Sequence, residues 1–474
     1  MYRGLITSLV FASLFACEEP TPAAPRSTAH SVAALQNGTS LVEPGLDPEI
    51  LALLSQVDAA RIASDIQSLV GFQTRNTCSD NSGTVAGIGA ARDWIQSQLA
   101  ALPGVEVRLD PWTYTGCGSS RTLHNVIAWI PGTGSPDRLI VIGGHYDSRN
   151  TVRNDGINPA PGANDSGSQT ALLLEVARML AGRSFDATVV FGLWSGEEQG
   201  LRGSAAFVNG NYRNYFPEGK LELNLTFDIV GGDNTANSLT ALQQFRLFSP
   251  GTPREISSGD GSTDDTSPSR GLMRHIGHWG AQYVPSMAML PKLREDRPNR
   301  GSDHKSFIAK GVPGVRFIDA NENLAHQHSA NDLFPYLTPT YTASVAQVVV
   351  ATVTNLARAS TPPRAMTAQR LSSTSVKLSW SPPGSGPPVD NYVISARPTT
   401  ENFYRTRVVV PDTVSSATVR VLEDLGIPAG TSYYVSVAAV DAAGHESLYA
   451  YPEYRCSSTS CRVPSGSLDV TATR

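Results

Sequence analysis

Imidazole and carboxylate side chains recur at five places in the middle of the chain, and four of these places follow an apolar run or open a helical one. They are His145 and Asp147 in GHYDS, Asp165 in GANDSGS, Glu197 and Glu198 in SGEEQG, Asp228 after LNLTF, and His326, His328 and Asp332 in HQHSAND. Taken singly, such a residue is more often a turn former or a hydrogen-bonded structural residue than a ligand. Together, these are the side chains that zinc uses in open catalytic sites. The residue types and their order therefore predict a metal centre.

The elements that must bring these places together are short strands that alternate with helices. Apolar residues at helical spacing predict helices over residues 48–69, 86–102 and 167–180. Short apolar runs predict strands over residues 123–130, 138–143, 187–194 and 221–230. Runs that are apolar throughout suit strands buried on both faces of a mostly parallel sheet, and their alternation with helices indicates a layered α/β domain. Such sheets bind ligands beyond the carboxyl ends of their strands, which is where the candidate ligands lie.

Six sequence segments follow one another in a recognisable order: HYDS, GANDSGS, WSGEEQGLRGS, FDIVG, GSDHKSF and H-x-x-x-D. This set resembles the di-zinc aminopeptidases of peptidase family M28, of the bacterial leucyl aminopeptidase and aminopeptidase Y type, over roughly residues 48–358. The resemblance implies a three-layer αβα sandwich around a mostly parallel central sheet, and two Zn²⁺ ions per chain. It also implies a ligand set, in which one zinc ion is held by His145 and Asp228, the other by Glu198 and His328, and both by the bridging Asp165.

The same resemblance implies that Glu197 is the general base and that Asp147 supports His145 by accepting its free ring N–H. Charge balance agrees with these roles. Two zinc ions that share a carboxylate polarise the scissile carbonyl and acidify a water between them, and three ligating carboxylates reduce their charge to about +1. A fourth ligating carboxylate would cancel that excess, so we expect Glu197 to stay off the metal ions and to pass the proton of the water to the leaving amine. Asp303 and His304 match a segment that lines the site, and they are assigned no ligand role.

The amino terminus, residues 1–17, is typical of a lipoprotein-type signal peptide. Arg3 precedes an apolar stretch of about 11 residues, whereas a helix that spans a bilayer needs about 20. The end of this stretch, LFAC, resembles a bacterial lipobox, in which the cysteine (here Cys17) is lipidated after cleavage; the alternative is an ordinary secretory signal. Residues 18–44 form an Ala/Pro-rich tether. We therefore expect an exported bacterial protein that is lipid-anchored to the cell envelope through Cys17 or secreted.

A second domain is predicted after the catalytic domain, which we place at residues 45–358. Residues 359–455 contain short strands of alternating polarity with turn signals between them, which is typical of a β-sandwich. Trp380 and the segment PAGTSYYVSVAA resemble a fibronectin type III domain, which implies an all-β immunoglobulin-like sandwich without chemistry of its own. This domain is a candidate for contact with a surface or polymer. Residues 456–474 are expected to be a C-terminal tail.

The amino-acid composition argues against some classes of binding partner. The net charge is −5 and no long Lys/Arg run occurs, so nucleic acid is not an expected partner. Five cysteines are too few for a disulfide scaffold, although Cys78–Cys117 and Cys456–Cys461 are plausible disulfides in an exported protein. We expect a monomer that contacts the membrane only through a lipid at Cys17.

The function that these features predict is a zinc exopeptidase that removes amino-terminal residues from peptides. A carboxypeptidase or a glutaminyl cyclase of the same superfamily is the first alternative. The cyclases work with a single zinc ion, so the complete set of five ligands counts against them. The second alternative is an inactive lipoprotein that binds a surface through its β-sandwich.

Overall fold

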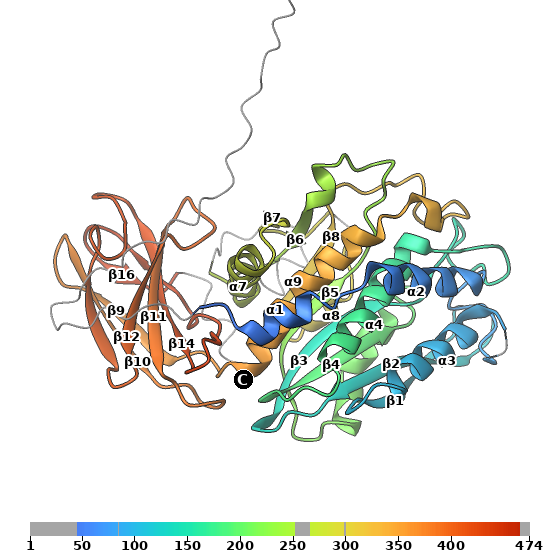
Figure 1. Ribbon diagram of the computed structural model, residues 1–474, viewed down its shortest axis with the longest axis horizontal. Coiled ribbons are helices and arrows are strands. Elements are labelled where there is room, and N and C mark those ends of the chain that lie inside the picture. The colour runs from blue at the N-terminus through green and yellow to red at the C-terminus, as the bar shows by residue number, and fades with distance from the viewer. Residues whose placement is uncertain (1–44, 84, 252–265, 298–299, 465–474) are drawn as a thin grey trace, which may run out of the picture. The chain divides into compact units, whose positions relative to one another are not determined.

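A central sheet of eight strands organises the catalytic part of the chain in the computed structural model (Figure 1). The structure describes residues 45–83, 85–251, 266–297 and 300–464. The predicted signal peptide and tether, and with them Cys17, lie outside the described residues. Among the residues that are described, no helix is both long and apolar enough to cross a membrane.

The sheet has the strand order β1-β2-β4-β3-β5-β8-β6-β7. Its strands are β1 (Glu106–Tyr114), β2 (Arg121–Ile130), β3 (Ser135–His145), β4 (Ala187–Trp194), β5 (Lys220–Phe227), β6 (Gln244–Phe248), β7 (Ala288–Lys292) and β8 (Gly314–Asp319). β3 pairs in parallel with β4 and β5, and β5 pairs in parallel with β8, whereas β1 and β2 form an antiparallel edge. The carboxyl ends of β3, β4, β5 and β8 therefore lie at one edge of the sheet.

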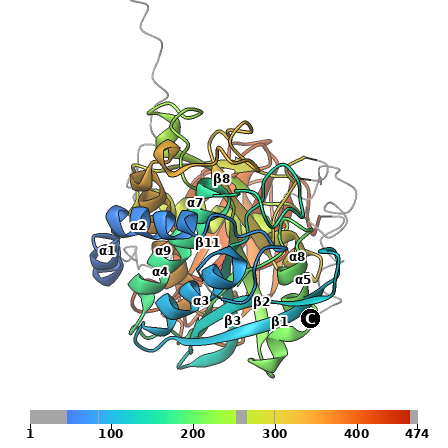
Figure 2. The ribbon, with the colours of Figure 1, turned by 90° about the vertical axis from the view of Figure 1, so that its right-hand side faces the viewer.

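Helices cover both faces of this sheet (Figure 2). They are α1 (Pro48–Leu54), α2 (Ala59–Gly71), α3 (Gly87–Ala100), α4 (Gln169–Leu180), α5 (Arg202–Val208), α7 (Pro268–Tyr283), α8 (His304–Ile308) and α9 (Pro339–Arg358). Within β3, Ile140 packs into the core cluster formed with α4 and α9, whereas the next residue, Val141, packs with Phe207 of α5 and Phe307 of α8. This alternation buries both faces, as a run that is apolar throughout requires. The predicted three-layer αβα architecture is confirmed.

The prediction of one continuous helix over residues 48–69 was wrong. Apolar spacing predicted a single helix over residues 48–69, whereas the structure has two helices, α1 and α2, in this stretch. The carboxylate of Asp58 accepts the N–H of Ala60 at 2.7 Å and so caps the start of α2. An aspartate at this position satisfies N–H groups that have no partner within a helix, so a new helix begins there.

The C-terminal region is built from antiparallel strands alone. One sheet contains β9 (Arg364–Arg370), β10 (Ser375–Ser381) and β13 (Ser416–Arg420); the other contains β11 (Asn391–Pro398), β12 (Thr406–Pro411), β14 (Tyr433–Val440), β15 (Tyr454–Cys456) and β16 (Cys461–Arg462). The buried side chain of Trp380 packs edge-on against Tyr392, with ring centroids 5.2 Å apart. The all-β sandwich predicted from the sequence is confirmed, and β16 continues its sheet beyond the predicted boundary at residue 455.

Both expected disulfides are present. Cys78 is bonded to Cys117 in the catalytic domain, and Cys456 is bonded to Cys461 between β15 and β16. Cys17 is the fifth cysteine and lies in the part of the chain that is not described.

Candidate metal centre

The candidate ligands lie at the carboxyl edge of the parallel strands. His145 is the last residue of β3 and is in register with Trp194, the last residue of β4. Glu198 follows β4 by four residues, and Asp228 follows directly after β5. Because these strands are parallel neighbours, residues far apart in the sequence meet at this edge.

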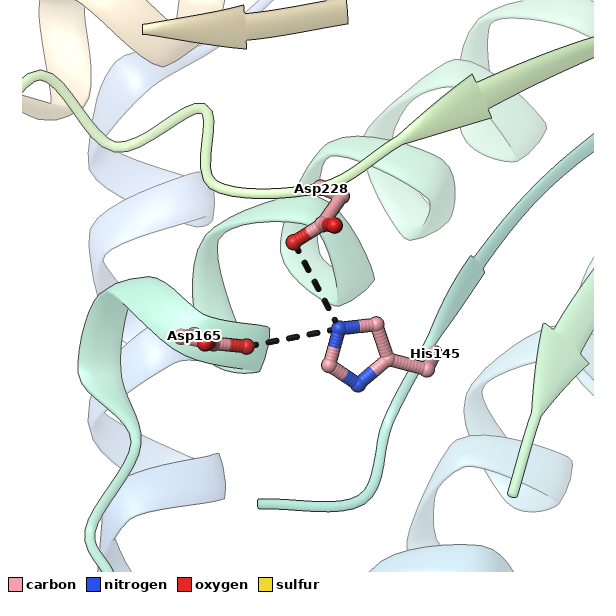
Figure 3. Close-up of side chains that lie close together, drawn as sticks. All are labelled: His145, Asp165 and Asp228. Carbon is pink, nitrogen blue, oxygen red and sulfur yellow. Dashed lines mark ion pairs between the residues drawn. The ribbon is translucent and has the colours of Figure 1, made fainter. Parts of the chain in front are cut away.

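Three of the candidate ligands form a first group around His145 (Figure 3). The Nε2 atom of His145 lies 3.3 Å from Oδ1 of Asp165 and 3.6 Å from Oδ1 of Asp228. Figure 3 shows the two carboxylates converging on this ring nitrogen, one from the turn before α4 and the other from the end of β5. All three side chains are at least 94% buried.

A second group forms around His328 and shares Asp165 with the first. The Nε2 atom of His328 lies 3.1 Å from Oδ2 of Asp165 and 3.3 Å from Oε1 of Glu198. Asp165 therefore presents one oxygen to each group. His326 belongs to neither group, since its Nδ1 lies 2.7 Å from Oδ2 of Asp233 and its ring stacks on Tyr336.

The polar atoms of these groups fit divalent metal ions. Oδ1 of Asp165 and Oε1 of Glu198 are buried and make no hydrogen bond, although a histidine nitrogen lies 3.3 Å from each. Buried carboxylate oxygens are normally hydrogen-bonded or bound to a metal ion. Imidazole and carboxylate together suit zinc and related divalent ions.

The electrostatics of the two histidines point the same way. Burial on its own would lower their pKa values, but the neighbouring carboxylates outweigh it. The pKa of His145 is thereby raised well above its usual value, and that of His328 is raised to about 10. The carboxylates around both histidines thus favour positive charge at these positions. A metal ion supplies that positive charge when it displaces the proton from the ring nitrogen.

Asp147 organises the loops beside this centre. Its carboxylate accepts the backbone N–H of Glu197 at 3.2 Å and that of Glu198 at 3.3 Å. The sequence led us to expect this carboxylate to accept the ring N–H of His145. In the structure, Nδ1 of His145 lies 3.0 Å from the backbone carbonyl oxygen of Asp147 and 3.6 Å from its carboxylate. The carbonyl is the nearer acceptor, because the carboxylate is turned toward the two glutamate amides.

Glu197 stands apart from both metal-binding groups of the described residues, although it is adjacent to Glu198. Its side chain is only partly exposed. Burial, reinforced by the negative charges of Glu198 and Asp228, raises the pKa of Glu197 well above the usual carboxyl range. A carboxyl group with a raised pKa beside a reaction centre is suited to accept and return a proton near neutral pH.

Two arginines contact the proposed ligands and were not recognised from the sequence. Nε of Arg149 lies 2.7 Å from Oε2 of Glu198, and its Nη2 lies 2.6 Å from Nδ1 of His328. Arg316 is fully buried, with Nη2 3.0 Å from Oδ2 of Asp228. Only the position of Arg149 directly after HYDS could have indicated a contact, since Arg316 lies within a strand and has no motif around it. Asp303 and His304 are buried close by but belong to neither group.

Two stretches of the chain match known protein families. Residues 125–353 match peptidase family M28, and residues 361–453 match the fibronectin type III domain. A probable zinc metalloprotease of Leptosphaeria maculans is 35% identical over 356 residues, which cover 70% of this chain and 81% of that protein. Another, from Pyricularia oryzae, is 36% identical over 398 residues, which cover 78% of this chain and 79% of that protein.

Among solved structures, the chain is similar to the LapA aminopeptidase of Legionella pneumophila, at 18% identity and a TM-score of 0.49, covering 67% of this chain and 76% of that one. A glutaminyl cyclase of Bacteroides thetaiotaomicron is similar at 17% identity and a TM-score of 0.45, covering 63% of this chain and 98% of that one. The matches to the family and to the metalloproteases lead to one conclusion: this chain belongs to peptidase family M28, a family of zinc metallopeptidases, and carries a fibronectin type III domain after its peptidase domain.

Proposed function

We propose that this protein is an exported exopeptidase that uses two zinc ions to remove amino-terminal residues from peptides. The observation that carries the proposal is the position of Asp165, whose two carboxylate oxygens lie 3.3 Å and 3.1 Å from histidine nitrogens of two separate groups. A carboxylate shared in this way is the arrangement found where two metal ions act together on one substrate.

In this proposal one zinc ion is held by His145 and Asp228, the other by Glu198 and His328, and both by Asp165. When bound, the two ions polarise the scissile carbonyl and lower the pKa of the attacking water. Arg316 holds the carboxylate of Asp228 from behind, 3.0 Å from Oδ2, and so keeps its other oxygen, Oδ1, toward His145.

Glu197 is the proposed general base. Its backbone N–H is fixed by Asp147, and its side chain stays outside both metal-binding groups. Glu198 lies in the second metal-binding group and Glu197 in neither, so Glu198 can serve as a ligand while Glu197 serves as a base. The carboxylate of Glu197 takes a proton from the attacking water and passes it to the nitrogen of the leaving peptide, which departs as a neutral amine.

The proposal is tested by three classes of substrate, each assayed with and without a chelator. These are aminoacyl anilides, amino-terminally blocked peptides with a free carboxyl terminus, and peptides that begin with Gln. We expect hydrolysis of the anilides that is lost with the chelator and restored by zinc. Hydrolysis of the blocked peptides alone would make the protein a carboxypeptidase, and cyclisation of the Gln peptides alone would make it a glutaminyl cyclase. Absence of any chelator-sensitive activity would favour the inactive surface-binding protein.

Export is supported by the signal-like amino terminus and by two disulfides, since disulfides persist mainly in oxidising compartments. The proposed lipid anchor can be tested by expressing the full chain and its Cys17→Ser variant. We expect the wild-type protein in the membrane fraction and the variant released from it; equal partitioning of the two would exclude the anchor.

A further inference from the structure

The shared ligand Asp165 lies in a turn whose first backbone N–H groups bond to acceptors outside the turn. Residues Ala163–Ser168 form this turn just before α4, and the φ and ψ angles of Asp165, −106° and 85°, are not helical. Its N–H groups therefore need acceptors from elsewhere in the fold, because a buried amide without a partner is costly.

Asp332 supplies these acceptors for three consecutive residues. Its carboxylate oxygen Oδ1 accepts the N–H of Asn164 at 2.8 Å, and Oδ2 accepts the N–H of Asp165 at 2.9 Å. Its backbone carbonyl accepts the N–H of Ala163 at 3.0 Å. Asp332 is only 2% exposed, so water does not compete for these bonds.

The position of Asp332 in the chain gives these bonds a consequence for the metal centre. Asp332 follows His328 by four residues, so the segment that carries one ligand of the second group also holds the turn that carries the shared ligand. Hydrogen bonds to ionised groups are shorter and roughly twice as strong as neutral ones. Two such bonds join the segment that carries His328 to the turn that carries Asp165.

We propose that Asp332 is a positioning residue for the shared metal ligand, and that both zinc sites depend on it. The inference rests on the ligands assigned under the proposed function. Asp332 belongs to neither metal-binding group of the described residues and acts through the backbone of Asp165. Loss of either charged hydrogen bond lets the turn move, and both zinc ions then lose a ligand, because Asp165 serves both.

A purely structural role would have a different signature, and Glu175 offers a matched comparison. Glu175 is a fully buried carboxylate of α4 that accepts the backbone N–H of Asp58 at 2.8 Å and pairs with Arg61 at 2.6 Å. It belongs to neither metal-binding group. Glu175→Gln therefore removes a buried, hydrogen-bonded charge from the same domain without disturbing the turn at Asp165.

The experiment measures zinc affinity of the full chain by competition with a chromophoric chelator, and melting temperature in EDTA and in zinc. For Asp332→Asn, in which an amide N–H₂ faces a backbone N–H, we expect about 10–100-fold weaker binding of both zinc ions. The rise in melting temperature caused by zinc should shrink accordingly. Glu175→Gln should melt earlier than wild type in EDTA but bind zinc with wild-type affinity.

An Asp332→Asn protein that melts earlier yet binds both zinc ions as tightly as wild type would overturn the proposal. If the wild-type protein binds no pair of zinc ions, the proposed function fails first, and the two failures are therefore distinguishable. A second measurement does not depend on any variant. Hydrogen exchange of the Asn164 and Asp165 amides should be slow in zinc-free wild-type protein; fast exchange that zinc alone suppresses would show that Asp332 does not hold the turn in advance.

Discussion

The carboxylate of Asp147 accepts the backbone N–H of Glu197 at 3.2 Å. This bond joins the loop after β3 to the loop after β4 directly beside the metal-binding groups. Because the backbone carbonyl of Asp147 also lies 3.0 Å from the ring of His145, one residue supports both the proposed base and a proposed ligand. The backbone carbonyl contacts His145, whereas the side-chain carboxylate binds the amide of Glu197. A substitution of the side chain therefore changes one contact and leaves the other.

Replacement of Asp147 by Asn should separate these two effects. The backbone carbonyl that faces His145 remains, so we expect the first metal-binding group, which contains His145, to keep its zinc ion. The backbone N–H groups of Glu197 and Glu198 both lose a charged acceptor, and one of them faces an amide N–H₂ instead, so kcat should fall by about 10–100-fold with little change in KM. Kinetics and zinc analysis of the same preparation test this. Loss of that zinc ion in proportion to activity would show that the carboxylate supports His145 instead.

The Glu197→Gln variant should bind both zinc ions and lose most of its turnover. A glutamine side chain has nearly the same shape but cannot accept the proton, so we expect kcat to fall by about 10²–10⁴-fold. Glu198→Gln is the matched control, because it changes the neighbouring residue, which lies in a metal-binding group, in the same way. That variant should lose zinc as well as activity. A fully active Glu197→Gln enzyme would show that Glu197 is not the general base.

The two histidines of the HQHSAND segment should respond differently to alanine. His328→Ala removes a member of the second metal-binding group, so we expect the number of zinc ions per chain to fall together with activity. His326→Ala leaves both groups complete, because His326 pairs with Asp233. Its zinc content should match wild type. The test is the zinc content of each variant after gel filtration. Equal zinc loss in both variants would contradict the assignment of His328, and not His326, as the ligand.

Acid should destabilise the catalytic domain through His275 in α7. This side chain is 3% exposed, and burial lowers its pKa from 6.5 to about 3. Below about pH 6.5 the unfolded chain therefore binds a proton that the folded chain does not, so the free energy of unfolding falls as the pH falls. At about pH 5 the loss from this one group is about 2 kcal/mol.

The test compares urea unfolding of wild type and His275→Gln at about pH 7.5 and about pH 5, both in EDTA. The variant cannot take up this proton, so its free energy of unfolding should depend less on pH, by about 2 kcal/mol over this interval. Its stability at the higher pH is not the readout, since the substitution also changes packing. Equal pH dependence in the two proteins would show that His275 titrates normally when folded.

Local sequence patterns predicted most of the architecture for a physical reason. A strand buried on both faces must be apolar throughout, and the run 187–194 corresponds to β4 residue for residue. The prediction failed over residues 48–69, where apolar spacing continues through a helix boundary. There the side chain of Asp58 decides the outcome, because it offers an acceptor to the first N–H groups of α2.

The sequence by itself determined the candidate chemistry of this protein: the types and order of the imidazole and carboxylate side chains, and their placement after strands that must share an edge. Only the tertiary structure decided which atoms meet. Asp332 and Asp165 lie 167 residues apart, and Arg316 reaches Asp228 from another strand of the sheet. Such contacts leave no local pattern, because they depend on where distant segments are brought by the packing of the helices and the order of the strands. The candidate ligands were recognisable in the sequence, whereas the groups that contact them became visible only in the fold.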